Sequence, residues 1–243
     1  MITVDEEHQE EINAVCRRIE TLAVDFARLT PFLGREESLS FARDCVDLAS
    51  ARNDLLKLAL PWDNERQPMA EAVEEAAVAA MALLLIAPEG NDDDIDRLTG
   101  RAVYYSVCAK IELGLVCGEK LDPTGATHLI SAISLCRTRA EWAKRHQKNS
   151  IAVAWLILAA SIYNRMSNDL NWPASITWRN ALSLSEQALE CADSQDGRDL
   201  ARSRVATYAS LLVGIDSDPS YSRRVEKYGG VQPERSAGTL PFW

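Results

Sequence analysis

Apolar residues recur at spacings of three and four along almost the whole chain, and this periodicity constrains the fold more than any other feature. Such spacing places the apolar side chains on one face of an α-helix. The first clear stretch carries Ile12, Val15, Ile19, Leu22, Phe26 and Leu29. No pair of alternating apolar segments is joined by the Asn-Gly or Asp-Gly turn that is typical of a β-hairpin. The sequence therefore predicts an all-α protein.

Proline, glycine and polar loops divide this pattern into about eight or nine predicted helices. We expect them over residues 12–29, 36–60, 69–86, 91–117, 127–147, 151–166, 175–191, 198–213 and 221–228. Short loops favour antiparallel neighbours, so we expect helical hairpins in a stacked array or a bundle, forming one domain over residues 1–228. Residues 229–243 are rich in Gly, Pro and Ser and are expected to form a flexible tail.

The charge of the chain is unevenly distributed. The formal net charge is −10; residues 1–121 hold 12 Lys and Arg against 24 Asp and Glu, whereas the remaining residues hold 14 against 12. An acidic surface of this kind repels nucleic acid and anionic membranes, so neither is expected as a partner. The apolar runs 76–87 and 150–163 are shorter than the roughly twenty residues of a membrane span. They are expected to be helices buried on most sides.

Cysteine and histidine usage points to a cytoplasmic protein without a metal or cofactor. The six cysteines form no Cys-x-x-Cys pair and stand mostly among apolar residues, which is typical of reduced, buried thiols. The acidic, polar N-terminal stretch lacks the basic start and apolar run of a secretory signal. With three histidines and no glycine-rich phosphate loop, no metal site and no cofactor are expected.

One stretch resembles the tetratricopeptide repeat, a family of stacked helical hairpins. Trp155, Leu158 and Ala159 match the start of its first helix, and the second-helix spacing is found at Ala181, Ser185 and Ala188. No second copy in this register occurs, and the connection between the two stretches reads as too long for the repeat. The resemblance implies the stacking of helical hairpins.

The densest basic cluster lies near the end of the helix predicted over 127–147. Its members are Arg137, Lys144, Arg145 and Lys148, together with Glu141. On a helical wheel, Arg137, Lys144 and Lys148 share one face with Glu141, and Arg145 lies at its edge. This face is either a solvated charged stripe or a surface that binds an anion.

Arg139 and His146 lie on the apolar side of the same predicted helix, seven residues apart. An Arg followed by a His at about this spacing, on an all-α body, resembles the motif of HEPN nucleases. The resemblance implies cleavage of an RNA phosphodiester, with imidazole moving a proton and guanidinium holding the developing charge. Ala140 stands where that family usually carries a polar residue. The other interpretation is that Arg139 forms a buried ion pair and His146 packs near the helix end.

The chain closes with Leu240, Pro241, Phe242 and Trp243. Two large aromatic side chains at the end of a flexible tail predict a docking element, either in cis on the same molecule or in trans on a partner. We therefore expect a non-enzymatic adaptor or scaffold that binds a protein partner along a helical groove, with a homo-oligomer left open. The alternative is a HEPN-like RNA-cleaving or nucleotide-acting enzyme.

Overall fold

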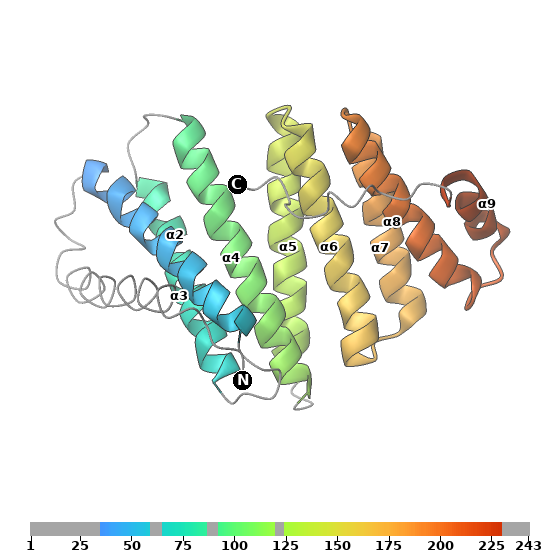
Figure 1. Cartoon of the computed structure of the whole chain (residues 1–243), viewed down its shortest axis with the longest axis horizontal. Coiled ribbons are helices and arrows are strands. Elements are labelled where there is room, and N and C mark those ends of the chain that lie inside the picture. Colours follow the sequence, from blue (N-terminus) through green and yellow to red (C-terminus); the bar gives the residue numbers. More distant parts are fainter. Residues whose placement is uncertain (1–34, 59–64, 87–91, 120–123, 230–243) are drawn as a thin grey trace. The chain divides into compact units, whose positions relative to one another are not determined.

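The computed structural model describes residues 35–58, 65–86, 92–119 and 124–229, which form eight α-helices and no strand. The helices are α2 (Arg35–Leu58), α3 (Arg66–Ile86), α4 (Asp92–Glu119), α5 (Thr124–Arg145), α6 (Asn149–Leu170), α7 (Ala174–Cys191), α8 (Gln195–Val213) and α9 (Pro219–Tyr228). Within each of the two units described below, adjacent helices pack against one another in a stacked array (Figure 1). The predicted all-α class and the stacked hairpins are confirmed. The first predicted helix, residues 12–29, lies outside the described residues.

The chain divides into two compact units, Met1–Val116 and Cys117–Trp243, and the boundary falls within α4. Of the described helices, α2, α3 and most of α4 belong to the first unit. The second unit contains α5 to α9. The expectation of one domain over residues 1–228 stays a prediction.

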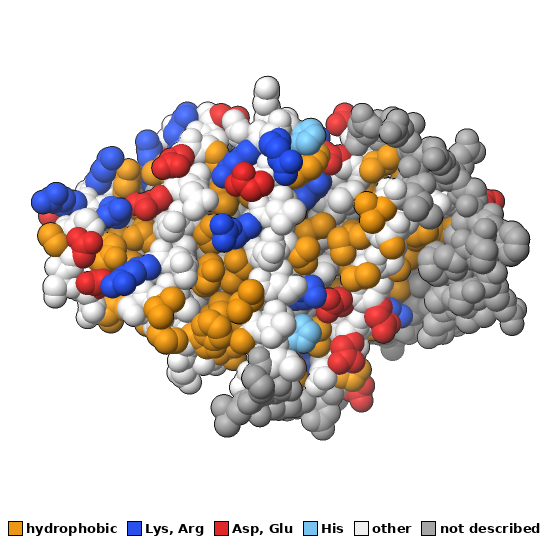
Figure 2. Space-filling model, turned by 180° about the vertical axis from the view of Figure 1, so that it is seen from behind, with side chains coloured by type: hydrophobic (Ala, Val, Ile, Leu, Met, Phe, Trp, Pro, Cys, Tyr) orange, Lys and Arg blue, Asp and Glu red, His pale blue; other side chains and the backbone are white. Residues whose placement is uncertain are grey.

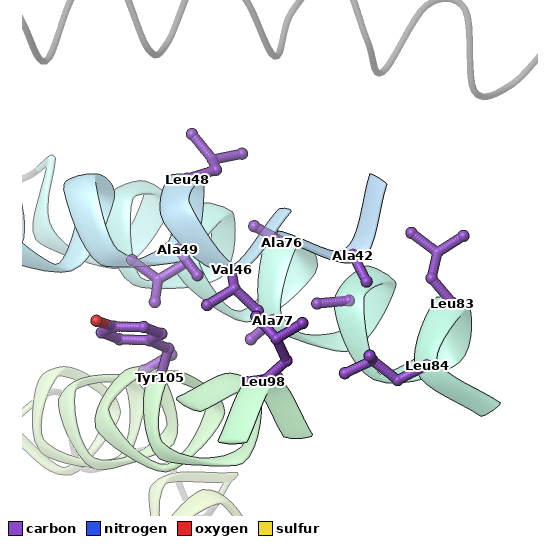
Figure 3. Packing of buried hydrophobic residues seen from close by; sticks show 14 of the residues in the cluster. Ala42, Val46, Leu48, Ala49, Ala76, Ala77, Leu83, Leu84, Leu98 and Tyr105 are labelled. Carbon is purple, nitrogen blue, oxygen red and sulfur yellow. The ribbon is translucent and has the colours of Figure 1, made fainter. Parts of the chain in front are cut away.

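In the first unit, α2 and α3 form a hairpin that shares an alanine-rich core with α4. Val46 and Ala49 of α2 point toward Tyr105 of α4, and Ala76 and Ala77 of α3 lie in the same cluster (Figure 3). All five side chains are 5% exposed or less. Alanine side chains fill so little space that helix axes can approach closely, which explains how helices of weak amphipathicity still bury a continuous core.

Polar contacts fix the register of α2 against α4. The contacts are Arg43 with Asp94 at 2.9 Å, Arg101 with Asp47 at 3.1 Å, and the Tyr105 hydroxyl with the Ser50 hydroxyl at 2.7 Å. The residue numbers rise together on both helices, so α2 and α4 run parallel, as the first helices of successive hairpins do.

In the second unit, α6 is the central helix and contacts α5, α7 and α8. Its residues Trp155, Leu156, Ile162 and Met166 are all 1% exposed or less. By length and composition α6 could also cross a membrane, with 56% of its most apolar window buried inside the protein. The uncharged run seen in the sequence has 14 residues, whereas the helix that contains it has 22 residues. The length of the run is therefore a poor guide to the length of this helix.

Helix α6 extends beyond its predicted end at residue 166. It continues to Leu170, and Asn171 then adopts a left-handed conformation with φ 53° that ends the helix. The connection to α7 is therefore 171–173, so the long loop expected from residue 167 is wrong. The departure from the tetratricopeptide pattern lies in helix length, because helices of 22 and 18 residues exceed its unit of about 34 residues.

Helix α9 is the last described helix of the second unit. Its N-cap Asp218 accepts a hydrogen bond from the backbone N–H of Ser220 at 2.8 Å, and Pro219 occupies the first turn. Tyr221 is buried, and Arg224 donates to Glu186 of α7 at 2.6 Å. The opposite face of α9 is polar and exposed, with Ser222, Arg223, Glu226 and Lys227 open to solvent.

Candidate functional site

The turn between α5 and α6 fixes the geometry of the basic cluster. The backbone N–H groups of Gln147 and Lys148 donate to the carbonyls of Lys144 and Ala143, at 3.1 and 2.9 Å. These two bonds, with Gln147 at φ 57°, form a Schellman motif. Helix α5 therefore ends at Arg145, two residues before its predicted end.

This turn removes Lys148 from the charged face predicted for it. Lys148 occupies the N-cap position of α6, so it does not share a helical face with Arg137 and Lys144, and that part of the prediction is wrong. The remaining stripe lies on α5 as expected. Arg137 and Arg145 are exposed, and Lys144 pairs with Glu141 at 2.9 Å.

Three basic side chains gather around the half-buried indole of Trp142. The guanidinium carbon of Arg139 lies 3.9 Å from the ring centroid, and the Nζ of Lys148 lies 5.3 Å from it. The His146 imidazole is stacked on the same indole, with centroids 4.3 Å apart. The cations of Arg139 and Lys148 are attracted by the negative face of the indole. The structure thus brings together Arg139, His146 and Lys148, which the sequence had assigned to two different faces.

Arg139 and His146 differ in their access to solvent. Arg139 is 9% exposed, whereas His146 is exposed at the end of α5. The Nδ1 of His146 lies 2.8 Å from the carbonyl oxygen of Trp142. A carbonyl oxygen can only accept, so Nδ1 carries the proton, and Nε2 is the nitrogen left to meet other groups.

The thiol of Cys191 lies at the C-terminal end of α7. Burial raises the pKa of this thiol, the charge of Lys144 lowers it, and the carboxylates of Asp193 and Glu190 raise it. The charge of Lys144 and the charges of these two carboxylates therefore act on this pKa in opposite directions.

A second feature, on α3, was not predicted from the sequence. Val78 and Leu85 are 47% and 87% exposed, and the exposed Ala82 lies between them on the same helical face. The run 76–87 was expected to be buried on most sides, because it has no polar stripe. The described part of α3 instead leaves an aliphatic strip, Val78, Ala82 and Leu85, open to solvent.

The remaining predicted features belong neither to the basic cluster at the α5–α6 turn nor to the aliphatic strip on α3. Phe242 and Trp243 lie outside the described residues. No group of three or more His, Cys, Asp or Glu side chains that could hold a metal ion occurs in the part of the chain that the structure describes. On the face drawn in Figure 2, Lys and Arg side chains lie beside histidine and hydrophobic side chains.

Comparison with known proteins adds no relative. No protein-family model, no curated protein and no solved structure matches the chain.

Proposed function

We propose that the chain is a non-enzymatic adaptor or scaffold of the cytoplasm that binds a protein partner along its stacked helices. The observation that carries this proposal is the aliphatic strip on α3. Helical-hairpin arrays offer long faces on which a partner helix or strand can lie.

The strip has a physical cost that a partner would relieve. Fully burying a Val or Leu side chain stabilises a complex by about 1.5–3 kcal/mol. Val78 and Leu85 expose 47% and 87% of their surface, so both retain a large part of that gain. Single exposed aliphatic residues are common, but three on successive turns of one face are typical of an interaction surface.

The thiols support a reducing compartment. Cys45, Cys108, Cys117 and Cys191 are free thiols, and Cys117 is buried. Burial raises the pKa of the Cys45 and Cys108 thiols to about 11, so neither is activated as a nucleophile or poised for oxidation at neutral pH. These thiols fit structural roles in the cytoplasm.

The RNA-cleaving alternative finds less support in the geometry. Arg139 is 9% exposed and its guanidinium lies against the Trp142 indole, so it offers little surface to a phosphate. The indole also stacks on His146. A pair that acts on one phosphodiester needs both side chains open to the same substrate.

Site-specific photo-crosslinking in cells tests the proposal. A photoreactive amino acid at position 82 is expected to capture a protein partner or a second copy, and Val78→Asp is expected to abolish the adduct. The matched control places the same photoreactive group at position 222, on the exposed polar face of α9. The proposal is wrong if position 82 yields no more adduct than position 222. It is also wrong if the purified chain cleaves RNA and His146→Ala abolishes cleavage without changing the melting temperature.

A further inference from the structure

We infer that the basic patch at the α5–α6 turn binds an acidic peptide segment of a protein partner. The basic patch consists of Arg137, Lys144, Arg145, His146 and Lys148. The inference rests on the proposed function, because it states the chemistry of a partner that an adaptor would bind. It concerns a different surface from the aliphatic strip on α3.

Positive charge is in clear excess at this turn. Over residues 137–150, five Lys and Arg residues and one His stand against a single carboxylate, Glu141. Glu141 pairs with Lys144. Arg137 and Arg145 are exposed, so their charges and hydrogen-bond donors reach solvent. Carboxylates are the natural counterpart of such a group, since Arg and Lys donate charge-assisted hydrogen bonds to them.

The Trp142 indole holds part of the patch in place before any ligand arrives. Lys148 lies 5.3 Å from the ring centroid, and His146 is stacked on the ring and tied through Nδ1 to the Trp142 carbonyl. Long basic side chains normally lose conformational entropy when they bind. Contact with the ring reduces that loss for Lys148, so its ammonium group is organised for an incoming carboxylate.

Helix electrostatics account for only part of the patch. Lys144 and Arg145 lie in the last turn of α5, where the helix dipole favours cations. Lys148 stands at the N-cap of α6, where the dipole disfavours a cation, and the first turn of α6 contains no acidic residue. A carboxylate bound beside Lys148 would interact favourably with both the cation and the helix end.

The surroundings favour a peptide over nucleic acid. The chain carries a net charge of −10, which repels a long polyanion. Glu141 lies within the basic stripe and pairs with Lys144. A peptide can place a few carboxylates away from Glu141, whereas the regular phosphates of a nucleic acid cannot avoid it.

Fluorescence anisotropy with the full chain tests the inference. The probe is a fluorescein-labelled peptide of alternating Glu and Gly with a central Tyr. The variant Arg145→Glu with Lys148→Glu is expected to weaken binding about tenfold or more, because two attractions become repulsions. The matched control, Arg223→Glu with Lys227→Glu on the exposed face of α9, has the same net charge and is expected to bind within about twofold of wild type.

Several outcomes decide the matter. If the charge-reversal variant melts early, Arg145→Gln with Lys148→Gln replaces it and should give a smaller loss of binding. Equal loss in the patch variant and the α9 control would overturn the inference, because it would reduce binding to net charge. Tighter binding of a single-stranded oligouridine, lost in the same patch variant, would also overturn it in favour of RNA. If the peptide fails to bind while the photo-crosslink at position 82 is retained, this inference fails and the proposed function stands.

Discussion

Replacing Gln147 with Gly should stabilise the protein, although the change removes a whole side chain. Gln147 is exposed and stands in the left-handed region at φ 57°. A residue with a Cβ pays roughly 1–2 kcal/mol for this conformation, whereas glycine adopts it freely. Glycine also makes the unfolded chain more flexible, which offsets about 0.4–1 kcal/mol of that gain. The net expectation for Gln147→Gly is a stabilisation of about 0.5–1 kcal/mol.

Thermal and urea unfolding of matched variants measure this effect. A gain of 1 kcal/mol corresponds to a rise in Tm of about 2–4 °C for a protein of this size. Gln187→Gly, inside helix α7, is the control and should lower stability by about 1 kcal/mol, since glycine is unfavourable in a helix interior. Asn171→Gly, at φ 53°, should give a smaller gain than Gln147→Gly, because Asn tolerates this region. If Gln147→Gly destabilises the protein as much as Gln187→Gly, the Schellman geometry assigned to this turn is wrong.

Three further outcomes are expected. Leu156→Ala should cost about 2–5 kcal/mol in chemical denaturation, as core truncations do, and clearly more than Leu158→Ala, because Leu156 is 1% exposed and Leu158 only half-buried. Tyr105→Phe should cost about 0.5–1.5 kcal/mol by removing the bond to Ser50; adding Ser50→Ala should then cost little, and full additivity would argue against the bond. Burial raises the pKa of the Cys108 thiol from 9.0 to about 11, so the unfolded chain loses this proton first as pH rises. The contribution of Cys108 to stability should therefore decline between pH 9 and 11, and a Cys108→Ala variant should lack that component.

The sequence alone was sufficient to predict where most of the described helices lie. The spacing of apolar residues predicted α7 and α8 to within a few residues at each end, because helical period and core packing follow from the same geometry. Helix ends were less accurate where the stop signal is not glycine or proline. The turn after α5 is formed by Gln147 in a left-handed conformation. Glutamine has no particular preference for this conformation, so its presence in the sequence does not predict the helix end. The polar residues after Met166 read as a loop, although α6 continues to Leu170.

The candidate surfaces needed tertiary structure. A helical wheel places Arg139 and His146 near Trp142, since Arg139 and Trp142 lie on α5 and His146 follows its last residue directly. Lys148 reaches the same indole only because the chain turns at Gln147 and starts a new helix. A helical wheel describes residues of one continuous helix, so it cannot place a residue that follows a turn.

The aliphatic strip on α3 shows the other limit of a sequence pattern. In the run 76–87 every side of the helix is apolar, so periodicity cannot say which side a neighbour covers. Packing against α2 and α4 buries Ala77 and Ala80 and leaves Val78 and Leu85 open. The sequence by itself determined that these residues form a helix with an apolar surface on all sides. Only the tertiary structure decided which side faces water, because burial depends on the position of neighbouring helices and not on the residue alone.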